Sequence, residues 1–142
     1  MSDLQRAIEI AVEAHKDQTR RNGSPYILHP LRVMVSMQNE LQQMVAVLHD
    51  VVEDSPWTIE QLRAEGFSEA VLDAVAALTK SADDDYQEYL QRVRSNPVAR
   101  AVKLADLRDN MNVPELPEVT DSDRQRLEKY RAAFILLQDG LG

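Results

Sequence analysis

The sequence predicts an all-α protein, and three observations lead to that prediction. Apolar residues recur at the three- and four-residue spacing of amphipathic helices along most of the chain. N-cap residues and prolines, which are typical helix start signals, separate these segments. No segment shows the convincing period-two alternation of a strand, and there is no internal repeat. With 142 residues the chain fits one domain over 1–142, which we expect to be a bundle of about six to eight helices.

The first predicted helix runs from about Ser2 or Asp3, each of which is a good N-cap, to Asp17. Its core face is apolar at helical spacing, and His15 continues that face. A lone histidine on a core face is more often a hydrogen-bonded core residue than a metal ligand. We therefore leave His15 out of the candidate site.

A loop follows this helix, with Asn22-Gly23 as its turn signal. Pro30 suits the first position of a helix, whereas the residue before a proline is biased away from helical dihedral angles. The sequence thus predicts a second helix over about 30–38, with His29 as its N-cap at a well-defined corner.

The central segment, 41–54, has the pattern of a helix that is apolar nearly all round and therefore mostly buried. It also contains His49, Asp50 and Glu53, which at about 100° per residue fan across one side of a helix. A carboxylate buried without a partner is costly, so some group must meet this polar stripe. A divalent metal ion is the simplest such group.

Capping signals mark the starts of the later helices. Thr58 and Gln61 form a capping box, Ser68 can cap the next helix, and Pro97 suits a first turn. The helices expected after the central one cover about 58–65, 68–78, 86–96, 97–111 and 122–137.

The predicted helix over 97–111 is largely apolar, yet Lys103, Asp106 and Asn110 fall on one face of it. It is therefore a second buried helix with a polar stripe, and a carboxylate lies at the centre of that stripe. This helix and the central helix supply the main polar residues that the sequence places where a core is expected.

Composition excludes several classes of protein. The chain has 24 acidic and 16 basic residues and a net charge of −8, which argues against a general nucleic-acid binder. It has no cysteine, so disulfides and thiolate metal sites are excluded. The N-terminal stretch lacks a signal-peptide pattern, and no window has about 18 consecutive apolar residues. We expect a cytoplasmic enzyme without a membrane segment.

Basic residues concentrate in one short part of this acidic chain, at Lys16, Arg20, Arg21 and Arg32. A solvated surface patch is one explanation, and a phosphate-binding site is the other. Adjacent arginines favour the second explanation when they lie beside a metal site, because the guanidinium fork matches phosphate oxygens.

Four polar residues are expected to be buried together: His29, His49, Asp50 and Asp106. Two imidazoles and two carboxylates suit Mn²⁺, Fe²⁺, Co²⁺ or Zn²⁺ rather than Ca²⁺ or a thiolate-bound copper. The spacing alone leaves a chance histidine–aspartate pair as the alternative.

Three motifs, in order, resemble those of a known family. They read AHKDQTRRNGSPYILHPLRV, VLHDVVEDS and VKLADLRDNM, and they span residues 14–111. The order histidine, then His-Asp, then a distant aspartate is similar to that of the HD-domain metal-dependent phosphohydrolases. More narrowly, the motifs resemble the hydrolase domain of RelA/SpoT alarmone enzymes and the stand-alone small alarmone hydrolases. The chain departs from this family at Asp17, where glycine is usual, and at Leu107-Arg108, where the family has Arg-Leu.

The resemblance implies a single HD-type helical domain whose ion is usually Mn²⁺. It implies four metal ligands, at His29, His49, Asp50 and Asp106. It also implies that Glu53 and Asp54 activate or orient the attacking water. The spacing agrees, because Glu53 lies one helical turn beyond His49 and can take a proton there.

Substrate contacts are implied as well. Arg20 and Arg21 match a basic pair near the nucleotide, Asn110 matches a polar contact, and Tyr130 corresponds to a tyrosine of the last helix in the small members. Lys103, one turn before Asp106, is a candidate for neutralising phosphate charge, with extension of its ammonium into solvent as the alternative.

The implied reaction is removal of the 3′-pyrophosphate from guanosine tetra- or pentaphosphate (ppGpp or pppGpp), with a guanine nucleotide as substrate. At this length we expect hydrolysis without synthesis. Two alternatives stay open: an HD hydrolase for another nucleotide, such as a nucleotidase or an NADPH phosphatase, and a module that binds nucleotides without turnover. The sequence leaves the oligomeric state open.

Overall fold

The computed structural model describes residues 3–20, 23–111 and 120–139, and this part of the chain confirms the all-α prediction. Its only β feature is an isolated bridge between Thr19 and Pro25. The described residues form nine helical segments, because the predicted central helix is divided in two. They are α1 Leu4–Ala14, α2 Leu28–Val35, α3 Glu40–Leu48, α4 Val51–Asp54, α5 Ile59–Ala64, α6 Glu69–Leu78, α7 Tyr86–Arg94, α8 Pro97–Met111 and α9 Asp121–Gln138.

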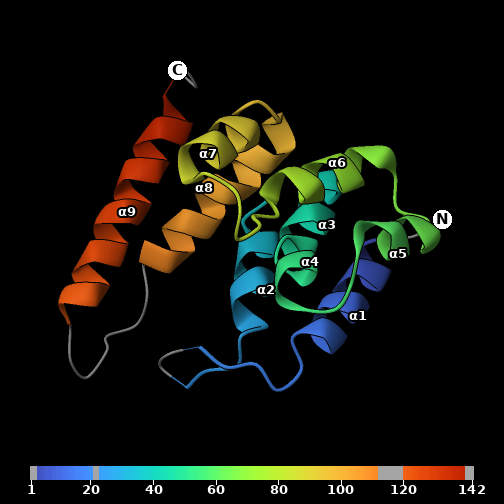
Figure 1. Cartoon of the computed structure of the whole chain (residues 1–142). Coiled ribbons are helices and arrows are strands. Elements are labelled where there is room, and N and C mark those ends of the chain that lie inside the picture. The colour runs from blue at the N-terminus through green and yellow to red at the C-terminus, as the bar shows by residue number, and fades with distance from the viewer. Residues whose placement is uncertain (1–2, 21–22, 112–119, 140–142) are drawn as a thin grey trace.

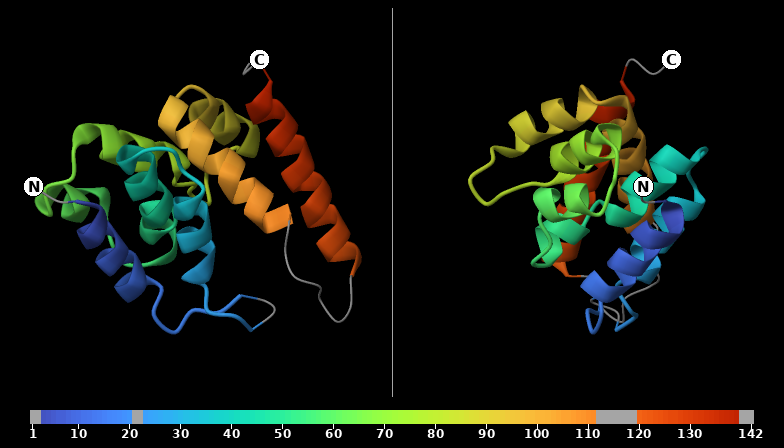
Figure 2. Two further views of the ribbon diagram at one scale, coloured as in Figure 1. Left: turned by 180° about the vertical axis from the view of Figure 1, so that it is seen from behind. Right: turned by 90° about the vertical axis from the view of Figure 1, so that its right-hand side faces the viewer.

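Helix α3 lies at the centre of the bundle, where it packs against α1, α2, α6 and α8. Helices α1 and α5 lie toward one end of the molecule, and α9 lies along α8 at the other end (Figures 1 and 2). Helices α2, α3 and α8 therefore meet in the middle, where the candidate site residues lie.

Among the residues that the structure describes, the interior of α3 is the most completely buried stretch. The side chains over 45–48 are all apolar and have no exposed surface, as the apolar pattern predicted. Burial of each large apolar side chain contributes about 1.5–3 kcal/mol to stability. The end of α3 is thus firmly packed just before the two polar residues that follow it.

The predicted caps of α1, α5 and α6 are confirmed. Asp3 caps α1 by accepting from the backbone N–H of Arg6 at 3.0 Å. Thr58 and Gln61 form the predicted capping box, and Ser68 caps α6. Among the described residues, no helix combines the length and apolar character that a bilayer span requires.

The first helix ends at Ala14, three residues before its predicted end, because Asp17 adopts a left-handed conformation with φ of 66°. Such a backbone is readily adopted by glycine, and aspartate is one of the few other residues that tolerates it. This explains physically why a glycine is usual at this position in the resembling family.

Replacement of Asp17 by glycine is expected to stabilise the protein by about 0.5–1 kcal/mol, because glycine has no Cβ to strain the left-handed backbone. Chemical denaturation measures this free energy of unfolding. The control is Asp73→Gly on the exposed face of α6. It should destabilise by about 0.3 kcal/mol, since glycine is a somewhat poorer helix former than aspartate. Destabilisation in both variants would contradict the expectation.

Two further sequence predictions about helix boundaries are wrong. His29 is not an N-cap, because α2 begins at Leu28 and places His29 in its first turn. The cause is a tight turn before it, in which the backbone N–H of His29 donates to the carbonyl of Tyr26 at 3.0 Å. Pro30 fits behind this turn because the first-turn N–H groups of a helix need no intrahelical partner.

The predicted helix over 41–54 is also not continuous. Helix α3 ends at Leu48 and α4 begins at Val51, with His49 and Asp50 between them. Asp50 has φ −102° and ψ −3°, away from the helical values of about −63° and −42°. The polar pair therefore sits at a junction in the helix rather than on a straight face.

Candidate metal centre

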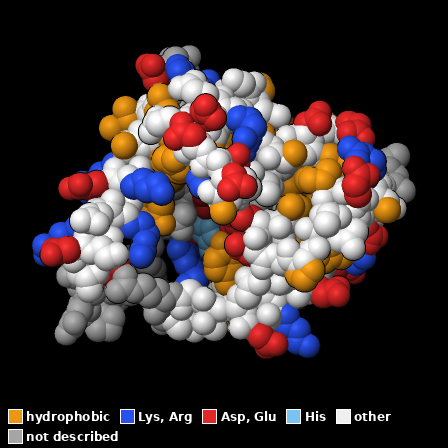
Figure 3. Space-filling view, viewed as in Figure 1, with side chains coloured by type: hydrophobic (Ala, Val, Ile, Leu, Met, Phe, Trp, Pro, Cys, Tyr) orange, Lys and Arg blue, Asp and Glu red, His pale blue; other side chains and the backbone are white. Residues whose placement is uncertain are grey.

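Four side chains from different parts of the chain converge in the middle of the bundle. His29 comes from α2, His49 and Asp50 from the junction of α3 and α4, and Asp106 from α8. One ligand atom from each lies within 4.8 Å of the others. Figure 3 shows a hollow on this face of the molecule, with a histidine side chain at its floor and charged side chains around its rim. The arrangement brings together all four residues predicted as metal ligands.

One nitrogen of each imidazole is held by an atom that can only accept a hydrogen bond. His29 Nδ1 lies 2.6 Å from Asp109 Oδ2, and His49 Nδ1 bonds to the backbone carbonyl of Ala46. Each Nδ1 must therefore carry hydrogen and donate it. This fixes both rings with Nε2 turned toward the centre of the cluster.

Both Nε2 atoms face the same carboxylate oxygen. Asp106 Oδ1 lies 2.7 Å from His29 Nε2 and 3.3 Å from His49 Nε2. A neutral ring that donates through Nδ1 has a lone pair at Nε2, and a lone pair facing a carboxylate oxygen is repulsive. A cation between these atoms, either added protons or a metal ion, removes the repulsion. Two imidazoles and two carboxylates are a donor set that fits a divalent ion.

Asp106 is the most heavily supported carboxylate of the cluster and is only 4% exposed. Lys103 Nζ donates to its Oδ2 at 3.0 Å, and Asn110 Nδ2 donates to its Oδ1 at 3.3 Å. Burial raises the pKa of Asp106, but Lys103 and the hydrogen-bonded histidines outweigh burial and hold that pKa well below its usual range. Asp106 is thus held ionised, as a metal ligand must be.

Lys103 points inward rather than into solvent, with 17% of its side chain exposed. Its ammonium also lies 5.6 Å from the centre of the Tyr89 ring. Extension into solvent, the alternative weighed from the sequence, is therefore not what the structure shows. The contact with substrate stays a prediction, since the ammonium already supports Asp106.

Asp50 is fixed by a residue that the sequence reasoning missed. The Tyr26 hydroxyl donates to Asp50 Oδ2, which also lies 3.0 Å from His49 Nε2. Burial raises the pKa of Asp50, but the charge and hydrogen bond of His49 outweigh it and lower that pKa to about 2. The spacing of Tyr26, three residues before His29, was the available signal.

Glu53 and Asp54 lie on α4, on the exposed side of the cluster. Glu53 Oε1 accepts a hydrogen bond from the backbone N–H of Lys80 at 3.1 Å. Partial burial, followed by the charges of Asp50 and Asp54, raises the pKa of Glu53 above its usual value. Partial burial and the charge of Asp50 also raise the pKa of Asp54. A raised carboxylate pKa makes a stronger proton acceptor.

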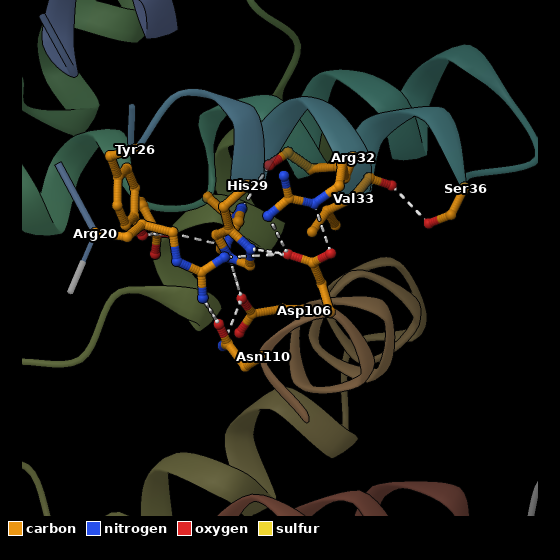
Figure 4. Close-up of polar contacts among 12 residues, drawn as sticks. Arg20, Tyr26, His29, Arg32, Val33, Ser36, Asp106 and Asn110 are labelled. Carbon is orange, nitrogen blue, oxygen red and sulfur yellow. Dashed lines mark hydrogen bonds and ion pairs between the residues drawn. The ribbon is translucent and has the colours of Figure 1, made fainter. Parts of the chain in front are cut away.

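The predicted substrate-binding residues lie beside the cluster where the structure describes them. Arg20 Nη2 donates to Asn110 Oδ1 at 2.8 Å, and Figure 4 shows Arg20 reaching between α2 and α8 toward Asn110. Tyr130 of α9 is partly buried, and burial raises its pKa with a smaller contribution from Asp106. Arg21 lies outside the described residues.

A second residue missed from the sequence is Asp109, which bonds to His29 as described above. The signal was present, since Asp109 is three residues after Asp106 and therefore on the same side of α8. It was overlooked because an acidic residue near a helix end usually lies in solvent.

Binding of a divalent ion is expected to strengthen as pH rises. Burial lowers the pKa of His49, but Asp50 and Asp106 outweigh burial and raise that pKa well above its usual value. The metal-free centre therefore holds a proton on His49 that a metal ion must displace. The stability that this proton gives the metal-free protein is lost as pH rises through the raised pKa of His49. Release of one proton allows up to about tenfold tighter binding for each pH unit.

Isothermal titration with Mn²⁺ at several pH values, in buffers with different ionisation enthalpies, measures both the affinity and the protons released. An affinity that does not change with pH, with no proton release, would contradict this expectation.

Comparisons with known proteins give related sequences and a related fold. The chain is 32% identical over 121 residues to a guanosine-3′,5′-bis(diphosphate) 3′-pyrophosphohydrolase of Aquifex aeolicus, covering 77% of this chain and 17% of that protein. It is 33% identical over 124 residues to a probable GTP pyrophosphokinase of Mycobacterium leprae, covering 78% of this chain and 16% of that protein. The chain thus spans about a sixth of the length of these relatives.

A solved structure described as a metazoan ortholog of SpoT that hydrolyses ppGpp shares the fold. It has a TM-score of 0.77 and 23% sequence identity, and the match covers 99% of this chain and 87% of that one. No family model matches the chain.

Proposed function

The chain is a relative of the ppGpp 3′-pyrophosphohydrolases in sequence and shares the fold of a ppGpp hydrolase, and from this we propose that it removes the 3′-pyrophosphate of ppGpp or pppGpp. The products are GDP or GTP, and pyrophosphate. The proposal rests chiefly on one observation, the convergence of two imidazoles and two carboxylates at the centre of the bundle. This reaction implies the cytoplasm as its compartment, because the cell makes and uses guanine nucleotides there.

We propose His29, His49, Asp50 and Asp106 as the ligands of the ion, with Mn²⁺ as the natural one. A divalent ion in this place supplies Lewis acidity to a phosphate and lowers the pKa of water. The donor set supports this assignment, because each of the four side chains offers one nitrogen or carboxylate oxygen and these atoms lie within 4.8 Å of one another. Asp109, the Ala46 carbonyl, Lys103 and Tyr26 hold the four in that orientation.

Glu53 is the proposed proton acceptor, with Asp54 orienting the same water. The oxygen of water attacks the phosphorus next to the ribose 3′ oxygen, and the bond from that phosphorus to the ribose oxygen breaks. Glu53 takes the proton of the attacking water, and the ribose oxygen gains a proton as it leaves. The raised pKa of Glu53 supports this role, since a general base works best when its pKa lies near the working pH.

Arg20, Lys103, Asn110 and Tyr130 are the proposed substrate contacts, together with Arg21. Arg20 and Lys103 bring positive charge to the edge of the cluster, where phosphate oxygens gain charge during the reaction. Asn110 connects the proposed substrate contacts with the proposed metal ligands, because it contacts both Arg20 and Asp106. Phosphates beside the ion would therefore lie within reach of Arg20.

A nucleotide assay with purified protein and added Mn²⁺ tests the proposal. Release of pyrophosphate from ppGpp, with GDP as the other product, is the expected result. Orthophosphate released from nucleoside monophosphates or NADPH would favour the nucleotidase or NADPH phosphatase alternative. Tight ppGpp binding without products would favour the sensing module. Formation of pppGpp and AMP from ATP and GTP would favour the activity in the name of the mycobacterial relative.

Arg20→Ala is expected to raise the KM for ppGpp by about 10-fold or more, because a hydrogen bond to a charged group is worth about 1.5–3 kcal/mol. Mn²⁺ content should not change, since Arg20 is not among the proposed ligands. Steady-state kinetics with metal analysis measures both. The matched control is Arg94→Ala, which removes an arginine paired with Asp139 instead. A KM that Arg20→Ala leaves unchanged would remove Arg20 from the substrate contacts.

A further inference from the structure

Asp109 connects the candidate metal ligands with the arginines beside them. Its Oδ2 lies 2.6 Å from His29 Nδ1, 3.1 Å from Arg32 Nη2 and 3.5 Å from Arg20 Nη1. Its Oδ1 accepts from Arg32 Nε at 2.8 Å. Figure 4 shows His29 and Arg32 projecting from α2 toward α8, with Arg20 reaching into the same cluster beside Asn110. One carboxylate thus meets a proposed ligand and a proposed phosphate contact at once.

The contact with His29 decides how that imidazole is presented. Because the Asp109 carboxylate only accepts hydrogen bonds, His29 carries its hydrogen on Nδ1 and keeps Nε2 free for an ion. Carboxylates that hold the outer nitrogen of a ligand histidine fix its ring orientation, and their loss costs about 10- to 100-fold in metal affinity or activity. Asp109 has the geometry for this role.

The contacts with arginine explain why a carboxylate is stable there. Arg32 binds Asp109 through two nitrogens and is itself 47% exposed, whereas Asp109 is only 17% exposed. Burial raises the pKa of Asp109, but the hydrogen bonds from Arg32 and His29 outweigh it and hold that pKa below its usual value. Arg32 thus fixes Asp109 from the solvent side, while Arg20 approaches the shared Oδ2 from the site.

We propose that Asp109 is a positioning residue with two effects. It holds the His29 ring so that Nε2 can bind the ion, and it keeps Arg20 beside the ion. The first effect concerns the metal centre alone. The second rests on the proposed function, because it assigns Arg20 to the phosphates of the substrate. A merely structural Asp109 would instead act as an ion pair that stabilises the packing of α2 on α8.

Two substitutions separate these effects. Asp109→Ala removes every contact. Asp109→Asn keeps one acceptor oxygen, which should take the Oδ2 place because three donors meet there and one meets Oδ1. The asparagine variant should therefore keep the bond to His29 and lose the charge that holds Arg20. The control is Asp84→Asn, which removes the charge from an aspartate paired with Arg92.

The first measurement is the affinity for Mn²⁺ alone, with thermal unfolding of the metal-free protein alongside. Asp109→Ala should weaken Mn²⁺ binding by about 10- to 100-fold. Asp109→Asn and Asp84→Asn should stay within about threefold of the unsubstituted protein. A purely structural role would lower the unfolding temperature of metal-free Asp109→Ala and leave its Mn²⁺ affinity unchanged, and that result would overturn the proposal.

The second measurement reads the imidazole directly. The chain has three histidines, so the ring nitrogens of ¹⁵N-labelled, Zn²⁺-loaded protein can be assigned individually. We expect a protected Nδ1–H signal for His29 that persists in Asp109→Asn and disappears in Asp109→Ala. Persistence of the signal in Asp109→Ala would also overturn the proposal.

The third measurement is kinetic and covers the case in which Asp109→Ala does not fold. Asp109→Asn should raise the KM for ppGpp severalfold with Mn²⁺ content unchanged, and an unchanged KM would remove the effect on Arg20. If the unsubstituted protein binds Mn²⁺ but releases no pyrophosphate, the proposed function fails. The Mn²⁺ affinity and the His29 signal still test Asp109 in that case.

Discussion

His49→Ala is expected to remove the bound metal and to lower the rate of pyrophosphate release by about 10³-fold or more. The rate falls because the ion contributes several kcal/mol of charge stabilisation in the transition state, and each 1.4 kcal/mol is about tenfold in rate. His49 is 3% exposed, and its Nε2 is the atom between Asp50 and Asp106, at 3.0 and 3.3 Å. Its loss leaves the carboxylates of Asp50 and Asp106 close together without the charge of His49 between them, which also opposes metal-free folding.

Elemental analysis of the purified variant, paired with a pyrophosphate assay, measures both losses. The matched control is His15→Ala, because His15 is 2% exposed and hydrogen-bonds through Nδ1 to Gln18 at 2.9 Å rather than to the cluster. The control creates a similar cavity and should keep its metal. Equal loss of metal from both variants would mean that His49 acts through packing.

Glu53→Gln is expected to keep the metal and to lower the rate by about 10²- to 10⁴-fold, the usual contribution of a general base. The amide removes the proton acceptor while its oxygen still accepts from the backbone N–H of Lys80. The local structure is therefore preserved, and the rate reports the proton transfer alone. Full activity in this variant would exclude Glu53 from that role.

The pH dependence gives a second test of Glu53. A general base must be ionised, so the rate of the unsubstituted protein should fall as pH drops through the pKa of Glu53. Partial burial and the charges of Asp50 and Asp54 place that pKa above the ordinary value of 4.5. Glu53→Gln should lose this acid limb of the rate profile. If Asp54→Asn loses this fall in rate at low pH instead, Asp54 is the proton acceptor and Glu53 orients the water.

The residues of the candidate site were predictable where a charged or polar residue lies in a segment that is otherwise predicted to be buried. His49, Asp50 and Asp106 lie in segments whose other residues are apolar, and a buried carboxylate requires a partner. That reasoning identified residues that the structure brings together across three helices. The caps at Asp3, Thr58 and Ser68 were predictable for a different reason, since each acts within one turn of its own helix.

The residues that hold the ligands were harder to predict from the sequence. Tyr26 bonds to Asp50, 24 residues away, and Asp109 bonds to His29, 80 residues away. Sequence spacing places each of them near one proposed ligand, but it does not show which distant ligand each one contacts. Only the packing of separate segments brings these partners together. The helical start at Leu28 was missed for a related reason, because the tight turn at Tyr26 outweighs the bias that Pro30 imposes.

The junction between α3 and α4 has a consequence for protein design. On an unbroken helix, consecutive side chains diverge by about 100°, so His49 and Asp50 would seldom reach the same point. The change of backbone angle at Asp50 brings both to one place. A redesign that substitutes strong helix formers at this junction would join α3 and α4 into one continuous helix. We expect such a protein to be more rigid and to lose its metal binding. It would be more stable but inactive. The non-helical backbone at Asp50 is therefore the feature to preserve when this bundle is engineered.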